Sequence, residues 1–135
     1  MKLRVLVTSV LLSMSAFAFG NSNKDLFNAL GALAKTDCGA GSCWVEVNGL
    51  ICRKSNDPSV STDASCTMTD YFDGSEISAI HSQKATELFG ALLKSGLNPD
   101  GAAGTSFIGA ERVSCRESNV TGEFYCQATV DLPVL

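Results

Sequence analysis

The sequence lacks several features on which common protein chemistries depend. It contains one histidine, His81, and no cluster of lysine and arginine residues. A single imidazole limits base and metal chemistry, because a catalytic or zinc-binding histidine needs partner groups that converge on it. With no basic patch and a net charge of −4 at pH 7, the chain disfavours phosphate backbones and anionic lipid surfaces. We therefore expect no nucleic-acid partner, no metal and no other cofactor.

Long apolar runs are also missing, apart from one near the N-terminus. Two cations precede the apolar residues 5–12, and the small-residue motif Ala16-Phe17-Ala18 follows them. This pattern predicts a secretory signal peptide over residues 1–20, cleaved after Ala18 or after Gly20. The run is too short to span a bilayer, so we expect a secreted or periplasmic product without membrane insertion. Removing the signal leaves eight basic and 14 acidic residues, a net charge of −6.

What the chain does contain is an internal repeat. Residues 37–56 align without a gap on residues 100–119, and seven of the aligned positions are identical. The similarity extends to helix-like segments before both stretches and to one cysteine after each. We interpret the chain as a duplicated helix–hairpin unit within one domain, residues 21–135. Copy one covers about 21–72 and copy two about 82–131.

Six cysteines follow the predicted signal, an even number that favours disulfides in an exported chain. The duplication narrows the possible disulfide pairings. Cys52 and Cys66 of copy one correspond to Cys115 and Cys126 of copy two, whereas the positions of Cys38 and Cys43 carry no cysteine in copy two. We predict the bridges Cys38–Cys43, Cys52–Cys66 and Cys115–Cys126. A link between the copies, such as one from residue 52 to residue 115, is the alternative.

Hydrophobic periodicity predicts an α+β fold with two helices and five strands. The helices are expected at residues 22–34 and between Ser82 and Gly96, with Ser82 as the N-cap. The strands are expected at residues 44–53, 64–68, 75–80, 107–116 and 124–130. Short connections indicate one five-stranded antiparallel sheet, stapled by disulfides, with both helices on one face.

Two local assignments rest on weighing alternatives. Segment 75–80 is interpreted as a strand, although Ile77 and Ile80 also fit an N-terminal extension of the second helix. Asn48-Gly49 resembles a hairpin turn, but its counterpart Glu111-Arg112 does not. We therefore predict a bulge within one long strand.

Candidate reactive groups each have a structural explanation. His81 is expected at a strand-to-helix junction or on the surface. Asp70, Asp73 and Glu76 are interpreted as a solvated hairpin tip, because no metal-loop spacing is present. Four residues separate Cys38 from Cys43, which favours a staple over a C-x-x-C redox pair. We predict no catalytic residue and no metal ligand.

A binding surface remains, made of polar loops on stiff strands. The loops 53–65 and 116–125 are expected in related positions, as a pair of contact arms. Trp44 and Phe107 are expected in the core, because both copies place an aromatic residue there. Asn119 begins an N-glycosylation motif, which predicts a surface loop. The candidate contact residues are Arg53, Asn56, Asp57, Tyr71, Phe72, Arg116, Asn119 and Tyr125.

We therefore expect a small secreted or periplasmic binding module for a protein partner, with enzyme inhibition as one form of such binding. One alternative is a small secreted enzyme that uses His81 with a nearby carboxylate. The other is a structural protein of an envelope or matrix.

Overall fold

A computed structural model of the chain describes residues 20–60, 62–102 and 104–130. The predicted signal lies outside these residues except for Gly20, the first residue of helix α2. The elements are α2 (Gly20–Gly31), β1 (Thr36–Gly39), β2 (Ser42–Ser55), β3 (Ala64–Asp70), β4 (Glu76–Ser82), α3 (Gln83–Lys94), β5 (Asp100–Ala102), β6 (Thr105–Ser118) and β7 (Phe124–Thr129).

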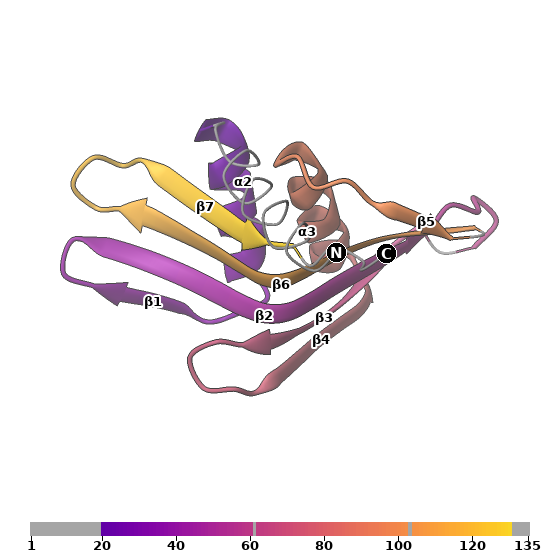
Figure 1. The fold of residues 1–135 in the computed structure, drawn as a ribbon, viewed down its shortest axis with the longest axis horizontal. Coiled ribbons are helices and arrows are strands. Elements are labelled where there is room, and N and C mark those ends of the chain that lie inside the picture. Colours follow the sequence, from indigo (N-terminus) through magenta and orange to yellow (C-terminus); the bar gives the residue numbers. More distant parts are fainter. Residues whose placement is uncertain (1–19, 61, 103, 131–135) are drawn as a thin grey trace, which may run out of the picture.

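The strands form one antiparallel sheet, and both helices lie on the same face of it (Figure 1). Its central order is β4-β3-β2-β6-β5. Strands β1 and β3 both pair with the same edge of β2, and strands β5 and β7 both pair with the same edge of β6. The α+β class and the antiparallel sheet are confirmed. The prediction of five strands is wrong, because the described residues form seven.

The two additional strands, β1 and β5, come from the glycine-rich segments before β2 and β6. Gly41 and Gly104 have positive φ angles of 81° and 74°, which allow the chain to reverse sharply. Each segment therefore folds back on the following strand as a tight hairpin, with Gly39 opposite Ser42 and Ala102 opposite Thr105. Alternating hydrophobicity could not reveal these strands, because they are short and rich in glycine.

The long strands β2 and β6 pair with each other through the centre of the sheet. Their ladder runs from Ser42 opposite Ser118 to Ser55 opposite Thr105, and both strands bend midway (Figure 1). At the bend, Gly49 has a φ of 56°, and the β2–β3 register shifts nearby. The predicted bulge is thus confirmed. It keeps Val47 and Leu50 on the same buried face, although they are three residues apart.

The helices cover the buried face of the sheet with their apolar stripes. Leu26 and Leu30 of α2, and Leu88 and Leu92 of α3, have no exposed surface. Ser82 caps α3 as predicted, since its Oγ accepts a hydrogen bond of 3.1 Å from the amide of residue 85. Segment 75–80 lies almost entirely in strand β4, so the strand assignment is confirmed over the helical one.

All three predicted disulfides are present. Two of them lie under the helices: Cys66 Sγ is 3.7 Å from the carbonyl oxygen of Ala85 in α3, and Cys126 Sγ is 3.4 Å from that of Asn23 in α2. The third joins β1 to β2 at one end of the sheet. The bridges are Cys38–Cys43, Cys52–Cys66 and Cys115–Cys126.

Candidate functional site

The sheet face opposite the helices carries a row of large side chains across three neighbouring strands. Trp44 of β2 lies opposite Arg116 of β6, which in turn lies opposite Tyr125 of β7. The neighbours Val45 and Cys115 point to the helices and are buried. Because side chains alternate along a strand, the row must point away from the core. We call this surface the open face.

This placement corrects the expectation that Trp44 and Phe107 fill the core. Both are only partly buried, whereas Val45 and Ile108 beside them are buried. The two aromatic residues do occupy equivalent places in the two halves of the sheet, but on the open face. The alternation of Val45 and Val47 is the sequence signal that would have placed the tryptophan there.

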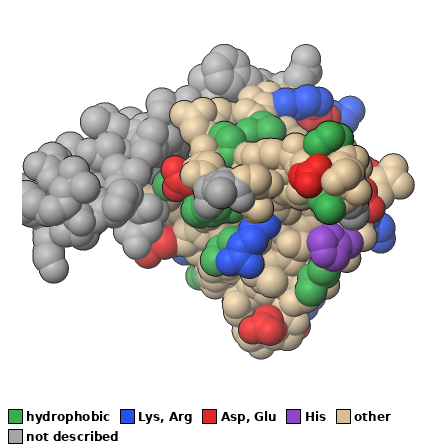
Figure 2. Space-filling view, turned by 90° about the vertical axis from the view of Figure 1, so that its right-hand side faces the viewer, with side chains coloured by type: hydrophobic (Ala, Val, Ile, Leu, Met, Phe, Trp, Pro, Cys, Tyr) green, Lys and Arg blue, Asp and Glu red, His purple; other side chains and the backbone are tan. Residues whose placement is uncertain are grey.

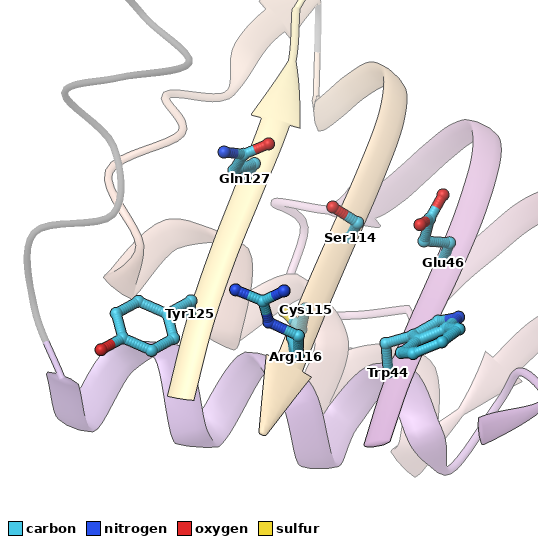
Figure 3. A pocket seen from close by; sticks show the side chains of 7 residues that line it. All are labelled: Trp44, Glu46, Ser114, Cys115, Arg116, Tyr125 and Gln127. Atoms are coloured by element: carbon cyan, nitrogen blue, oxygen red, sulfur yellow. The ribbon is translucent and has the colours of Figure 1, made fainter. Parts of the chain in front are cut away.

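The guanidinium of Arg116 lies between the rings of Trp44 and Tyr125 (Figure 3). The next row along the strands adds the polar side chains of Glu46, Ser114 and Gln127, and together these residues line a hollow of about 240 Å³. Pockets for drug-sized ligands usually measure about 300–1,000 Å³. The hollow therefore suits a single side chain better than a large cofactor.

Two further aromatic residues extend this surface from the turn between β3 and β4. The ring centre of Phe72 lies 6.5 Å from that of Trp44 and 5.8 Å from that of Tyr71. The guanidinium of Arg112 lies 5.8 Å from the Tyr71 ring, within the range of a cation–π contact. We define the aromatic–arginine patch as Trp44, Tyr71, Phe72, Arg112, Arg116 and Tyr125.

Asp70 holds the turn that presents these aromatic residues. Its Oδ1 accepts hydrogen bonds from the amides of Phe72, at 2.7 Å, and Asp73, at 3.3 Å. Asp70 is only 3% exposed, so its interpretation as part of a solvated tip is wrong. Asp73 and Glu76 are exposed, as expected. Hydrogen bonds from the Ser75 hydroxyl and amide lower the pKa of Asp73.

The predicted contact residues divide between the two ends of the sheet. Tyr71, Phe72, Arg116 and Tyr125 belong to the patch. Asn119 is exposed near the same end, and its amide donates to the carbonyl oxygen of Gly41 at 2.9 Å. Its position in an exposed loop confirms the surface location expected from its glycosylation motif.

Arg53, Asn56 and Asp57 lie at the far end, where the Asn56 amide donates to Gly104 at 2.8 Å. The two ends of the sheet are separated by the length of the 14-residue strand β2, which is about 40 Å at the usual rise per residue. The loops 53–65 and 116–125 therefore lie at opposite ends of the sheet, and their role as a pair of contact arms stays a prediction. The far loop has its own internal order, because Asp57 Oδ1 accepts hydrogen bonds from the Ser59 amide and hydroxyl, which lower the pKa of Asp57.

Arginine is concentrated on the open face. The three arginines of the described residues, Arg53, Arg112 and Arg116, all extend from outward positions of β2 and β6. None of them forms an ion pair within the described part of the chain, where Lys94 and Asp25 on the helices make the one recorded pair. Sequence alternation does not reveal Arg112, because residues 111 and 112 fall at the bend, where simple alternation fails.

His81 lies away from the hollow. It is exposed at the junction of β4 and α3, with a φ of 49°, and forms the purple surface spot in Figure 2. The predicted surface or junction position is confirmed. Among the described residues, no three His, Cys, Asp or Glu side chains gather closely enough to hold a metal ion.

A larger hollow of about 520 Å³ lies along the edge of β6, between β5 and β7. Its lining is mostly apolar, with Leu97, Phe107, Ile108 and Val130 among its residues. It gathers no arginine and none of the predicted contact residues. Residues 131–135, which follow Val130 in the sequence, lie outside the described residues.

Comparison with family models, curated proteins and solved structures finds no match to this chain. No described helix has the length and apolar character needed to cross a membrane. The three disulfides fit an oxidising, extracellular environment. A function for the chain is therefore argued from the geometry of its surface.

Proposed function

We propose that this chain is a small secreted or periplasmic binding module whose aromatic–arginine patch contacts a protein partner. The observation that supports this is the gathering of two arginines and four aromatic residues on one half of the sheet face that no described helix covers. Tryptophan, tyrosine and arginine are the residue types most enriched among those that dominate binding energy at protein interfaces.

The stiffness of the patch favours binding. Four of its six residues come from the paired strands β2, β6 and β7, and a disulfide ties β6 to β7 next to Arg116 and Tyr125. Asp70 fixes the turn that carries the other two. A preformed contact surface loses little conformational entropy on binding, so more of the contact energy appears as affinity. Enzyme inhibition by such a rigid surface is one form of this function.

We also propose that the two halves arose by duplication. The repeat alignment places Ser42 on Thr105 and Ser55 on Ser118, so exchanging the halves converts the first pair of the β2–β6 ladder into its last. The hydrogen bond from Asn56 to Gly104 becomes the one from Asn119 to Gly41. One disulfide in each half joins equivalent positions. Among the described residues, the strand β4 has no counterpart in the second half.

Affinity capture with patch and control variants tests the proposed function. Oxidised wild-type protein, Tyr71→Ser and Leu93→Ser serve as baits against envelope and culture-fluid proteins. Tyr71 is 47% exposed in the patch, and Leu93 is 41% exposed on helix α3, so the two changes remove similar exposed apolar residues from opposite sides. We expect to capture a partner that binds wild type and Leu93→Ser equally well. Once purified, that partner should bind Tyr71→Ser at least tenfold more weakly than wild type.

A partner that binds all three baits equally would refute the patch as the contact surface. Size-exclusion chromatography of the protein alone distinguishes the binding module from a structural envelope or matrix protein, because the structural role requires self-association. An activity that survives loss of the patch but not His81→Gln would favour the enzymatic alternative.

A further inference from the structure

The arginine row on the open face has an incomplete counterpart at the other end of the sheet. The first row places Asp37, Trp44, Arg116 and Tyr125 side by side on β1, β2, β6 and β7. The equivalent positions of the repeat form a second row, which contains Asp100, Phe107, Arg53 and Ser65 on β5, β6, β2 and β3. Both rows contain an arginine beside an aromatic residue. Only the first row has an aromatic residue on both sides of the arginine.

Arg116 has hydrogen-bonding capacity that the described part of its own chain leaves unused. A guanidinium carries five N–H donors and stays charged at all accessible pH values. Within the described residues, no acidic side chain forms an ion pair with it. The nearest aromatic hydroxyl, that of Tyr125, instead donates a hydrogen bond of 3.0 Å to Glu123. The guanidinium therefore points into the hollow with its donors available (Figure 3).

We propose that Arg116, between Trp44 and Tyr125, binds a carboxylate side chain of the protein partner. A planar guanidinium matches a carboxylate with two parallel hydrogen bonds, and Trp44 and Tyr125 flank it from the neighbouring strands. The hollow of about 240 Å³ accommodates one aspartate or glutamate side chain. This inference rests on the proposed binding function and specifies the chemistry of the residue that binds there.

Glu46 makes the slot selective. It lies one row along β2 and lines the same hollow, so it repels an anion at Arg116, and it repels a dianion more strongly than a single carboxylate. A single carboxylate at Arg116 is compatible with it, whereas a dianionic phosphate or a highly acidic stretch is not. The net charge of −4 likewise opposes a strongly acidic surface as the partner. The slot thus fits one acidic side chain in an otherwise neutral or basic contact area.

Nuclear magnetic resonance titration with small probes tests the slot without knowledge of the partner. The probes are N-acetyl-glutamate amide and, as a control of equal size, N-acetyl-glutamine amide, added to the full chain with its disulfides formed. We expect the glutamate probe to shift the Arg116 Nε–H and the Trp44 indole N–H resonances, with saturation in the millimolar range. The glutamine probe should bind at least tenfold more weakly, because it lacks the charge.

Variants from both rows provide matched controls. Arg116→Gln should abolish the shifts caused by glutamate, while Arg53→Gln in the incomplete row should leave them unchanged. Glu46→Gln should tighten glutamate binding severalfold, because it removes a competing negative charge. Ser65→Tyr should complete the second row and produce new, glutamate-dependent shifts at Arg53. Unchanged backbone amide spectra establish that each variant is folded.

Equal shifts with the two probes, or glutamate shifts that persist in Arg116→Gln, would overturn the proposal. So would weaker glutamate binding in Glu46→Gln. The proposed function fails separately, when a captured partner is insensitive to Tyr71→Ser. A partner that requires Tyr71 but binds Arg116→Gln with unchanged affinity would leave the binding function standing and remove the carboxylate slot.

Discussion

The disulfides should differ in their contribution to stability, because they lie in different surroundings. The sharpest comparison is between the more exposed Cys38–Cys43 bridge and the buried Cys115–Cys126 bridge, whose cysteines are five and 11 residues apart. The loop-entropy relation gives about 2 kcal/mol for the shorter loop and about 3 kcal/mol for the longer one. Loop length alone therefore predicts a difference of only about 1 kcal/mol.

Burial should widen this difference. Cys115 and Cys126 are 1% and 4% exposed, and they pack beneath helix α2. Replacing both with alanine leaves unfilled space in the core, at about 1 kcal/mol for each lost sulfur. The Cys38–Cys43 bridge leaves less such space, because Cys38 is exposed and Cys43 is only partly buried at the margin of the core. The expected losses are thus about 5 kcal/mol for the buried bridge and about 2 kcal/mol for the exposed one.

The chain supplies the replacement residues for the exposed bridge. Cys38→Gly with Cys43→Ser introduces the residues found at the equivalent positions of β5 and β6, where a similar hairpin forms without a disulfide. Urea unfolding, followed by circular dichroism, compares this variant with Cys115→Ala/Cys126→Ala and with wild type. Equal losses for both variants would refute the reasoning, since they would mean that burial of the sulfur atoms adds nothing.

Three smaller perturbations test other parts of the structure. Ser82→Ala removes the N-cap of α3 and should lower the free energy of unfolding by about 1 kcal/mol in urea denaturation. Gly49→Ala should cost about 1–2 kcal/mol, because its φ of 56° strains residues with a side chain, and Gly49→Asn should cost less in the same assay. The hydrogen bond to Glu123 raises the pKa of Tyr125 above its ordinary value of 10.0. The stability from this bond should be present below pH 10.0 and disappear as the pH rises through the raised pKa, and Glu123→Gln should lower the phenolate midpoint seen by absorbance at 295 nm.

The elements that the sequence predicted well are those with two independent signals. The buried disulfides followed from cysteines at equivalent positions in the repeat, and their strands from the alternation around Cys66 and Cys126. Helix α3 combined an N-cap serine with an apolar stripe. The bulge at Gly49 was identified only because the repeat contradicted the local turn signal.

The errors came from signals that do not specify a direction in space. Aromatic residues at Trp44 and Phe107 are compatible with either face of a sheet, and the choice depends on their neighbours. The two polar loops are equivalent in the repeat, and the antiparallel pairing of the long strands places them at opposite ends of the sheet. The candidate site depends on cross-strand register, which brings Trp44 next to Arg116 across 72 positions of sequence.

The β2–β6 ladder also determines the order in which the chain can fold. The hairpins β2–β3 and β6–β7 join neighbouring stretches, whereas the ladder joins strands separated by 50 or more residues. Contacts distant along the chain form slowly, because a large loop must close before they contribute. We therefore expect a nascent molecule to pass through a stage with two oxidised hairpins and two bare strand edges. Two such molecules can exchange hairpins, so refolding at high concentration should yield interlocked dimers.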